Sequence, residues 1–269
     1  MASLRTRSIL IVAGVGAIVT LGLLLLTVNA ACPSQERDPA CTRVLFIGNS
    51  YTTVNDLPGV FASLARSGGH RVETKSAAVD GWTLVNHADS PATATALTAS
   101  PWDIVVLQEQ SQIPAVEEFR QAQMYPAARR LISSIRNRGA RPLLYLTWGR
   151  RDGWPETGMP TYASMQSAID DGYLAIAADQ RVAVAPVGVA WASLVTRGAG
   201  APLWQQDGSH PTEAGTYLAA CVFYATIFQE SPKGLGYHSS LSAEAAAMIQ
   251  SVAAETALGD PAKWPPPSE

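Results

Sequence analysis

The chain has 269 residues and a formal net charge of -3, with 47% hydrophobic and 15% charged residues. This composition supports a large buried core and excludes long disordered stretches. Lys and Arg form no cluster beyond short pairs. A protein that binds the phosphates of nucleic acid needs a basic face. This chain is near neutral and its sequence shows no such face, so we exclude this class of protein.

The first 31 residues have the pattern of a targeting segment. Arg5 and Arg7 precede an uncharged run over residues 8–31, and small residues at 28–30 form an A-x-A-like cleavage point. We therefore expect export, with a cleaved signal peptide over residues 1–31. An uncleaved membrane anchor is the alternative, because the apolar run is long for a signal peptide, and only then do we expect membrane contact. A lipoprotein box that ends at Cys32 is a further alternative.

Export bears on the three cysteines of the chain. Cys32 and Cys41 flank a polar loop that contains proline, and oxidising conditions outside the cytoplasm permit a disulfide between them. Cys221 lies among Ala, Val and Phe in a helical pattern, which favours a buried free thiol. No pair of Cys-x-x-Cys units occurs, so the sequence does not indicate a structural zinc site.

Apolar runs alternate with helical periodicities after a short linker over residues 32–42. The runs predict strands at residues 43–48, 103–107, 142–147 and 181–185, the first of them buried, and residues 71–78 are a further strand candidate. The periodicities predict helices, at residues 56–67, 117–138, 161–180, 212–229 and 242–258. One domain over residues 43–260 accommodates all of them. A Pro-rich tail over residues 261–269 follows, and we expect it to be unstructured.

This alternation predicts an α/β fold. Strands that alternate with helices form a parallel sheet with right-handed crossovers and helices on both faces. Ligands of such folds bind beyond the carboxyl ends of the strands. The segments after the first, third and fourth predicted strands therefore lie on one rim. The loop from Trp148 to Pro160 follows the fourth strand, and it is either a rim loop that shapes a pocket or a plain surface connection.

Ser50 follows the first predicted strand, in Gly48-Asn49-Ser50-Tyr51-Thr52. A serine in this place can expose its hydroxyl at the rim. A hydroxyl is a weak nucleophile, and it needs a neighbouring base that is oriented by a third group. Taken alone, Gly-Asn-Ser is more often an ordinary turn. The interpretation of Ser50 as a nucleophile therefore depends on finding its base.

His210 has the setting expected of that base among the four histidines. It precedes Pro211-Thr212-Glu213, the pattern of a helix start. Asp207 lies three residues before it, so one loop can present both the imidazole and the carboxylate that orients it. Simple capping of the helix by Asp207 and Ser209 is the alternative.

Together, the Ser50 segment and Asp207-Gly208-Ser209-His210 resemble the two end blocks of the SGNH (GDSL-like) hydrolases. The resemblance covers residues 43–228. It implies a flavodoxin-like three-layer α/β/α sandwich with a parallel sheet of about five strands. It also implies a serine hydrolase of ester bonds, with Ser50, Asp207 and His210 as its catalytic residues. The lipase-type motif G-x-S-x-G is not present, because Thr52 stands where its second glycine would be.

The resemblance further implies an oxyanion hole. Its expected donors include the backbone N–H groups of Ser50 and of Gly81, which follows the second predicted strand, although Gly81 in an ordinary turn is the alternative. The third block of the family reads Gly-x-Asn-Asp, and its Asn is a donor. This chain has Gln108-Glu109-Gln110 there, so we expect the Gln108 amide to donate, with Gln110 as the second choice. The missing Asn supports the rival interpretation, a non-catalytic surface binding domain of the same fold.

The expected substrate is a small-molecule or carbohydrate ester. Carbohydrate O-deacetylation is the first expectation, and a lipase or lysophospholipase activity is the second. Trp82 and Trp148 are expected to contact the substrate, because aromatic rims suit both sugar rings and acyl chains. Arg150 and Arg151 either face solvent, as adjacent loop arginines usually do, or contact an anionic substrate. No sequence motif indicates a metal or cofactor, and the sequence indicates no oligomeric state.

Overall fold

The computed structural model describes Cys32, residues 38–198 and residues 202–268. The expected signal peptide, membrane anchor and lipoprotein box fall on the segment that precedes Cys32, which lies outside the described residues. Within the described ranges, no helix is both long enough and apolar enough to cross a bilayer.

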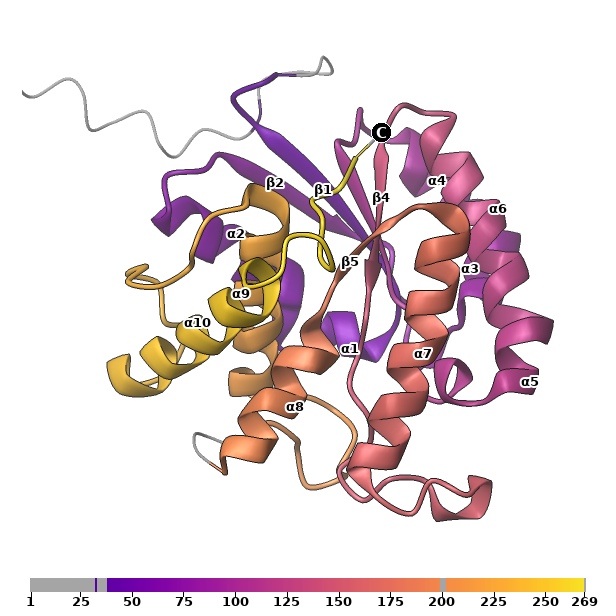
Figure 1. The fold of residues 1–269 in the computed structure, drawn as a ribbon. Helices are drawn as coiled ribbons and strands as arrows, with labels where there is room; N and C mark the ends of the chain where they lie inside the picture. The colour runs from indigo at the N-terminus through magenta and orange to yellow at the C-terminus, as the bar shows by residue number, and fades with distance from the viewer. Residues whose placement is uncertain (1–31, 33–37, 199–201, 269) are drawn as a thin grey trace, which may run out of the picture.

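Five parallel strands form one sheet in the order β2-β1-β3-β4-β5 (Figure 1). The strands are β1 (Thr42–Ile47), β2 (Val72–Ser76), β3 (Ile104–Leu107), β4 (Arg141–Tyr145) and β5 (Ala183–Ala185). This order is that of the flavodoxin-like doubly wound fold, so the predicted three-layer sandwich is confirmed. Ile47 pairs with Leu107, and Leu107 pairs with Leu144, so β1, β3 and β4 reach the same edge of the sheet.

Helices cover both faces of the sheet (Figure 1). One face carries α2 (Leu57–Ser67), α8 (Val187–Arg197), α9 (Glu213–Phe228) and α10 (Ala243–Leu258). The other carries α3 (Leu84–Asp89), α4 (Pro91–Thr98), α6 (Tyr125–Arg136) and α7 (Tyr162–Gln180). Successive strand residues point to opposite faces. Phe46 therefore packs in the first core, whereas its neighbours Leu45 and Ile47 pack in the second.

The predicted helix over residues 117–138 is wrong in its continuity. It begins as α5 (Glu117–Phe119), widens into a π-helical turn at Arg120–Met124 and continues as α6. Pro126 lies in the first turn of α6. Proline lacks an N–H group and its ring displaces the carbonyl four residues before it, so a regular helix cannot pass through this position.

Four helices were not predicted, namely α1 (Ser50–Thr53), α3, α4 and α8. The first three are too short to show a helical periodicity. α8 begins two residues after β5, and its Val-rich start does not separate from the strand by composition.

The C-terminal tail packs on the domain, although it was expected to be unstructured. Residues 261–268 form no helix or strand. Trp264, however, is only 3% exposed and packs in the second hydrophobic core, the one on the face of the sheet that carries α6 and α7. The carbonyl of Pro267 accepts a hydrogen bond from Arg141 Nη1 at 3.2 Å. The tail is therefore docked on the domain, because a tryptophan buries more apolar area than any other side chain.

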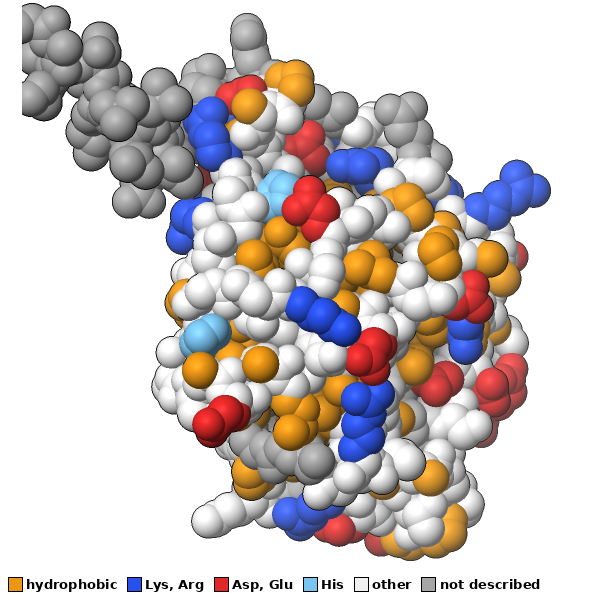
Figure 2. Space-filling model, turned by 60° about the vertical axis from the view of Figure 1, so that its left-hand side comes forward, with side chains coloured by type: hydrophobic (Ala, Val, Ile, Leu, Met, Phe, Trp, Pro, Cys, Tyr) orange, Lys and Arg blue, Asp and Glu red, His pale blue; other side chains and the backbone are white. Residues whose placement is uncertain are grey.

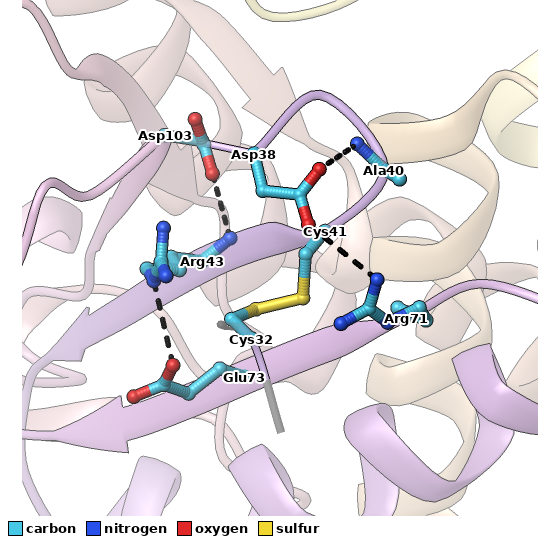
Figure 3. The surroundings of a disulfide bond; sticks show 8 residues. All are labelled: Cys32, Asp38, Ala40, Cys41, Arg43, Arg71, Glu73 and Asp103. Atoms are coloured by element: carbon cyan, nitrogen blue, oxygen red, sulfur yellow. Dashed lines mark hydrogen bonds and ion pairs between the residues drawn. A yellow bond between two sulfur atoms is a disulfide. The ribbon is translucent and has the colours of Figure 1, made fainter. Parts of the chain in front are cut away.

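Cys32 and Cys41 form the disulfide that the sequence left open, with Cα atoms 5.6 Å apart (Figure 3). It lies at the start of β1, where Arg43 is buried and forms an ion pair with Glu73 of β2. The N–H of Arg43 donates to Asp103 Oδ2 at 2.7 Å. These contacts anchor the amino end of β1 at the edge of the sheet opposite to the rim. Cys221 is buried with a free thiol, as predicted.

The surface carries charges of mixed sign. Figure 2 shows acidic and basic side chains scattered over one face, without a continuous patch of either sign. Several of the exposed charges form pairs, such as Arg129 with Asp179 at 2.9 Å and Arg197 with Glu255 at 2.8 Å. Only Val79, Val195 and Met248 are exposed large hydrophobic side chains within the described part of the chain.

Candidate active site

A pocket of about 380 Å³ opens beyond the carboxyl ends of β1 and β3. These neighbouring strands mark the point where the strand order reverses, which is where open parallel sheets bind ligands. Ten residues from five separate segments line the pocket. They are Asn49, Ser50, Tyr51, Asp80, Gly81, Gln110, Ser111, Arg150, Ser209 and His210.

Ser50 is the first residue of α1, directly after the turn that leaves β1. The side chain of Asn49 caps this helix by accepting a hydrogen bond from the N–H of Tyr51. The first N–H groups of a helix have no partner within it, so the N–H of Ser50 remains able to bind a group in the pocket. A side chain at Gly48 would collide with Gln108 Oε1 and Thr52 Oγ1, which is why this turn needs glycine.

Ser50, His210 and Asp207 form a continuous hydrogen-bonded chain. His210 Nε2 lies 3.0 Å from Ser50 Oγ, and His210 Nδ1 lies 2.5 Å from Asp207 Oδ2. A carboxylate only accepts hydrogen bonds, so the proton of a neutral His210 is on Nδ1 and Nε2 can accept the hydroxyl proton of Ser50. The structure thus brings together three residues that lie up to 160 positions apart.

The environment of Asp207 favours its ionised form. Burial by itself would raise the pKa of this carboxyl. Hydrogen bonds from the His210 ring and from the backbone N–H groups of Ser209 and His210 outweigh that effect and hold the pKa below its usual range. The side chain remains 45% exposed. Asp207 therefore carries the negative charge that an imidazolium at His210 would need.

The loop after β4 holds the His210 segment in place. Trp148 Nε1 donates to the carbonyl of Ser209 at 2.9 Å, and the N–H of Arg151 donates to the carbonyl of Gly208 at 2.8 Å. The hydroxyl of Tyr51 lies 2.8 Å from Ser209 Oγ. The loop is therefore a pocket-shaping element, the first of the two interpretations that its sequence allowed.

The structure does not support substrate contact by Trp148. Its ring is fully buried and is stacked between the rings of Tyr51, at 4.5 Å, and Trp191, at 4.0 Å. Trp148 is thus a wall behind the pocket that positions Tyr51 and the His210 segment. Trp82 is half-buried beside His87, with ring centroids 5.0 Å apart, and is not among the residues that line the pocket.

Gln108 also departs from its expected role. Its side chain is fully buried, and its amide nitrogen donates to Asn49 Oδ1 at 2.9 Å and to the carbonyl of Glu109 at 2.6 Å. Its oxygen accepts hydrogen bonds from the N–H of Asn49 and the hydroxyl of Thr52. Both amide hydrogens are used, so none is left for a ligand. Gln108 instead fixes the turn that carries Ser50.

Gln110, the second choice from the sequence, lies in the pocket. Its amide nitrogen makes only long contacts of 3.4 and 3.5 Å with its neighbours Gln112 and Ser111, so it can turn toward a ligand. Gly81 lines the pocket from the opposite loop. It has φ +74° in a turn closed by a hydrogen bond from the N–H of Trp82 to the carbonyl of Val79. Gly81 is therefore a turn glycine that also borders the pocket.

Glu109 connects the two loops that carry Gln110 and Gly81. Its carboxyl is fully buried and accepts hydrogen bonds from the N–H of Gln110 at 2.6 Å and of Leu84 at 3.1 Å. Burial raises its pKa to about 7, an effect that these two hydrogen bonds only partly offset. The side chain does not line the pocket, so its contacts position the pocket walls.

His87 holds the turn that carries Ser50 through a hydrogen bond to the carbonyl of Gly48. It is buried, and burial lowers its pKa, so the ring is neutral. Its Nε2 donates to the carbonyl of Gly48 at 2.7 Å, and its Nδ1 accepts from the hydroxyl of Thr93 at 2.9 Å. A larger hollow of about 590 Å³ lies on the far side of His87, between α4 and α6. Neither Ser50 nor His210 reaches it.

Four further residues line the pocket with polar groups and were not predicted from the sequence, namely Tyr51, Asp80, Ser111 and Ser209. Three of them are chain neighbours of Ser50, Gly81 or His210, and that proximity was the available signal. Ser111 directly follows Gln110, the second choice for the oxyanion donor, so the same signal applied to it. Among the described residues, no group of three or more His, Cys, Asp and Glu could hold a metal ion.

Comparison with known proteins places the chain among hydrolases. It is 30% identical to a protein from Slackia heliotrinireducens that is described as an SGNH hydrolase. That match covers 69% of this chain and 98% of the other, with a TM-score of 0.59. No protein-family model matches the sequence, and neither does any curated protein sequence.

Two more distant structures share the fold. A DUF4886 family protein from Bacteroides uniformis is 18% identical, with a TM-score of 0.69 over 80% of this chain and 94% of the other. An acetyl-xylooligosaccharide esterase from Geobacillus stearothermophilus is 15% identical, with a TM-score of 0.51 over 68% of this chain and 92% of the other.

Proposed function

The chain belongs to the SGNH hydrolases, and on this premise we propose that it is an exported serine esterase with Ser50 as its nucleophile. The observation that carries the proposal is the hydrogen-bonded chain from Ser50 Oγ through His210 to Asp207 at the wall of a pocket. A hydroxyl within 3.0 Å of an oriented imidazole is within reach for proton transfer. A non-catalytic binding domain has no need of this alignment.

Acylation is the first half of the proposed reaction. Ser50 Oγ attacks the ester carbonyl as its proton passes to His210 Nε2. Asp207 stabilises the positive charge that His210 then carries. When the tetrahedral intermediate collapses, the C–O bond to the alcohol breaks, and His210 gives its proton to the departing oxygen. The alcohol leaves and the acyl group remains on Ser50.

Deacylation repeats these steps with water. His210 takes a proton from a water molecule as that molecule attacks the acyl-enzyme. The carboxylic acid leaves, and the proton returns to Ser50 Oγ. In both halves the N–H groups of Ser50 and Gly81 bind the oxyanion. We assign the third donor to Gln110, because its amide borders the pocket and that of Gln108 does not.

We further propose that the substrate is a short acyl ester of a polar molecule, with carbohydrate O-deacetylation as the leading case. None of the ten residues that line the pocket has an aliphatic side chain of Val, Leu, Ile or Met. Such a lining suits hydroxyl-rich substrates and offers little to a long acyl chain.

Export remains part of the proposal. It is supported by the targeting pattern of residues 1–31 and by the disulfide between Cys32 and Cys41. With its sulfur bonded to Cys41, Cys32 has no thiol to accept a lipid, which favours a signal peptide or an anchor over a lipoprotein.

Hydrolysis of p-nitrophenyl acetate by the purified protein tests the esterase proposal. We expect the Ser50→Ala substitution to lower kcat/KM by at least about 10³-fold. Ser133→Ala, an exposed serine on α6, is the matched control and should keep the full rate. Equal rates for wild-type protein and Ser50→Ala would exclude the nucleophile. A panel of acetylated xylan, acetylated peptidoglycan fragments and lysophospholipid then ranks the substrate classes.

A further inference from the structure

Two adjacent arginines after β4 have opposite surroundings. Arg151 is exposed, and its guanidinium binds Asp152 through Nε at 3.3 Å and Nη2 at 3.0 Å. Arg150 is half-buried and lines the same pocket as Ser50 and His210. The first is an ordinary surface arginine, whereas the second directs its charge into the candidate active site.

The backbone on both sides of Arg150 is fixed. The N–H of Arg150 donates to Met165 Sδ at 3.3 Å, and its carbonyl accepts from the N–H of Gly153 at 3.0 Å. The preceding Gly149 donates to Gln166 Oε1 of α7 at 2.8 Å and accepts from Trp204 Nε1 at 3.1 Å. The position of Arg150 at the pocket is therefore imposed by the fold and is not an accident of a loose loop.

The guanidinium of Arg150 has no protein partner. Within the described part of the chain, no carboxylate lies within ion-pair distance of it and no side-chain hydrogen bond involves it. Its Nε is buried without any acceptor. A buried polar group that lacks a partner lowers stability, and a charged one lowers it more, so such a group in a pocket points to a ligand that completes it.

The other charges of the pocket do not neutralise Arg150. Asp80 lines the pocket from the Gly81 loop, but its carboxylate accepts a hydrogen bond from the Thr53 hydroxyl at 3.0 Å and forms no ion pair with Arg150. Asp207 is bound to His210. Arg150 does lower the pKa of the Tyr51 hydroxyl by its charge, although burial, the largest effect, raises that pKa overall. The guanidinium thus acts on the pocket interior.

We propose that Arg150 binds a carboxylate of the substrate, so that the ester attacked by Ser50 belongs to an acidic molecule such as an acylated acidic sugar. This inference rests on the proposed esterase function and specifies its substrate class. The planar guanidinium presents a fork of N–H donors that matches both oxygens of a carboxylate. The carboxylate belongs to either the alcohol part or the acyl part of the ester, and the two are separated by experiment.

Paired synthetic esters test the proposal. For the alcohol part, 3-acetoxybenzoate is compared with its methyl ester, and for the acyl part, phenyl hydrogen adipate is compared with its methyl ester. We expect wild-type protein to prefer the anionic member of at least one pair by more than about tenfold in kcat/KM. Arg150→Met should lower that preference by about 10- to 100-fold, the range expected for hydrogen bonds to a charged group. Arg150→Lys keeps the positive charge but not the fork of N–H donors, so its preference should lie between those of the wild-type protein and Arg150→Met.

Arg151→Met is the matched control, and it should keep both the preference and the absolute rates. Thermal melting shows whether each variant is folded, and Arg150→Lys carries the test if Arg150→Met is not. Calorimetric binding of benzoate to the Ser50→Ala protein, with and without Arg150→Met, measures anion binding without turnover.

Three results decide the matter. Loss of the preference and of benzoate binding in the Arg150 variants alone supports the proposal. Ser50-dependent hydrolysis with no preference in either pair, or a preference unchanged by Arg150→Met, overturns it and leaves the esterase function standing. Absence of any Ser50-dependent hydrolysis overturns the proposed function, and the inference about its substrate falls with it.

Discussion

Two polar segments meet at the pocket, and they differ in what their side chains bind. In the segment before α9, Asp207 and His210 are 45% and 34% exposed, and they make a chain of hydrogen bonds toward Ser50. In the segment after β3, Gln108 and Glu109 are fully buried, and they bind the backbone of the turns that carry Ser50, Gln110 and Leu84.

The two segments therefore have different roles: the first takes part in the reaction, and the second holds the walls of the pocket in place. The partly exposed ring of His210, which binds only side chains, can change partners when a substrate arrives. Buried groups that bind backbone N–H groups cannot do so without leaving those groups unsatisfied. Substitutions in the first segment should therefore mainly affect turnover, whereas substitutions in the second should mainly affect stability.

The largest expected effect is on turnover in the first segment. His210→Ala should lower kcat for p-nitrophenyl acetate by about 10⁴-fold, because Ser50 loses its base. The free energy of unfolding should change little, since the ring is partly exposed. Because the two residues act as a unit, Ser50→Ala combined with His210→Ala should be no slower than either single variant. An additive loss in the double variant would show that the two residues act separately.

Gln108→Met and Gln110→Met compare the structural role with the role in the reaction most directly. The first leaves the N–H of Asn49 and the hydroxyl of Thr52 without an acceptor, so it should lower the free energy of unfolding by about 2 to 4 kcal/mol. The second removes a donor from the pocket. It should lower kcat by about 10²-fold. Because Gln110 Oε1 accepts a hydrogen bond from the N–H of Gln112 at 2.8 Å, it should also lower the free energy of unfolding by about 1 kcal/mol, less than the Gln108 variant does. Urea denaturation and steady-state kinetics measure both, and an exchange of the two patterns would restore Gln108 as the oxyanion donor.

Glu109 should make stability depend on pH in a defined window. Burial raises the pKa of this carboxyl in the folded protein from its ordinary value of 4.5 to about 7. Between these values the folded state holds a proton that the unfolded state has lost. Its contribution to stability is therefore full below pH 4.5 and decreases by about 3 kcal/mol as the pH rises through 7.

Glu109→Gln should remove that decrease, because an amide does not titrate. Urea unfolding between pH 4 and pH 8 for the two proteins gives the difference directly. A wild-type profile that rises over this range relative to that of the variant would contradict the assigned direction of the pKa shift.

The smallest expected effect concerns Tyr51 of α1, which contacts the segment before α9. Its hydroxyl binds Ser209 Oγ at 2.8 Å, while its ring is stacked on Trp148. Tyr51→Phe keeps the stack and removes one hydrogen bond, so stability should fall by about 1 kcal/mol and kcat by only a few-fold. A loss of kcat as large as that of His210→Ala would mean that the hydroxyl takes part in the reaction itself.

Local pattern was sufficient for much of this protein. Apolar runs predicted four of the five strands, and the more polar residues 71–78 were a strand candidate that the structure bears out, although only Val72 of β2 is buried. The alternation of strands with helices predicted the parallel sheet and its rim. Asp207 and His210 could be paired because three residues of spacing place both on one loop, whatever surrounds it. Ser50 became a candidate because a residue directly after a buried parallel strand must reach the rim.

The direction in which a single side chain points, and the groups that it binds, depend on contacts between distant parts of the chain. Gln108 and Gln110 are equally polar and two residues apart, yet packing against the Ser50 turn buries one and leaves the other in the pocket. Trp148 is enclosed by Tyr51 and Trp191, which no local spacing relates to it. Arg150 and Arg151 are neighbours of one type, and only the contacts of their loop with α7 and the His210 segment turn one inward and one outward. Periodicity shows which side of a helix or strand faces water. The position of one side chain also depends on which distant residues pack beside it.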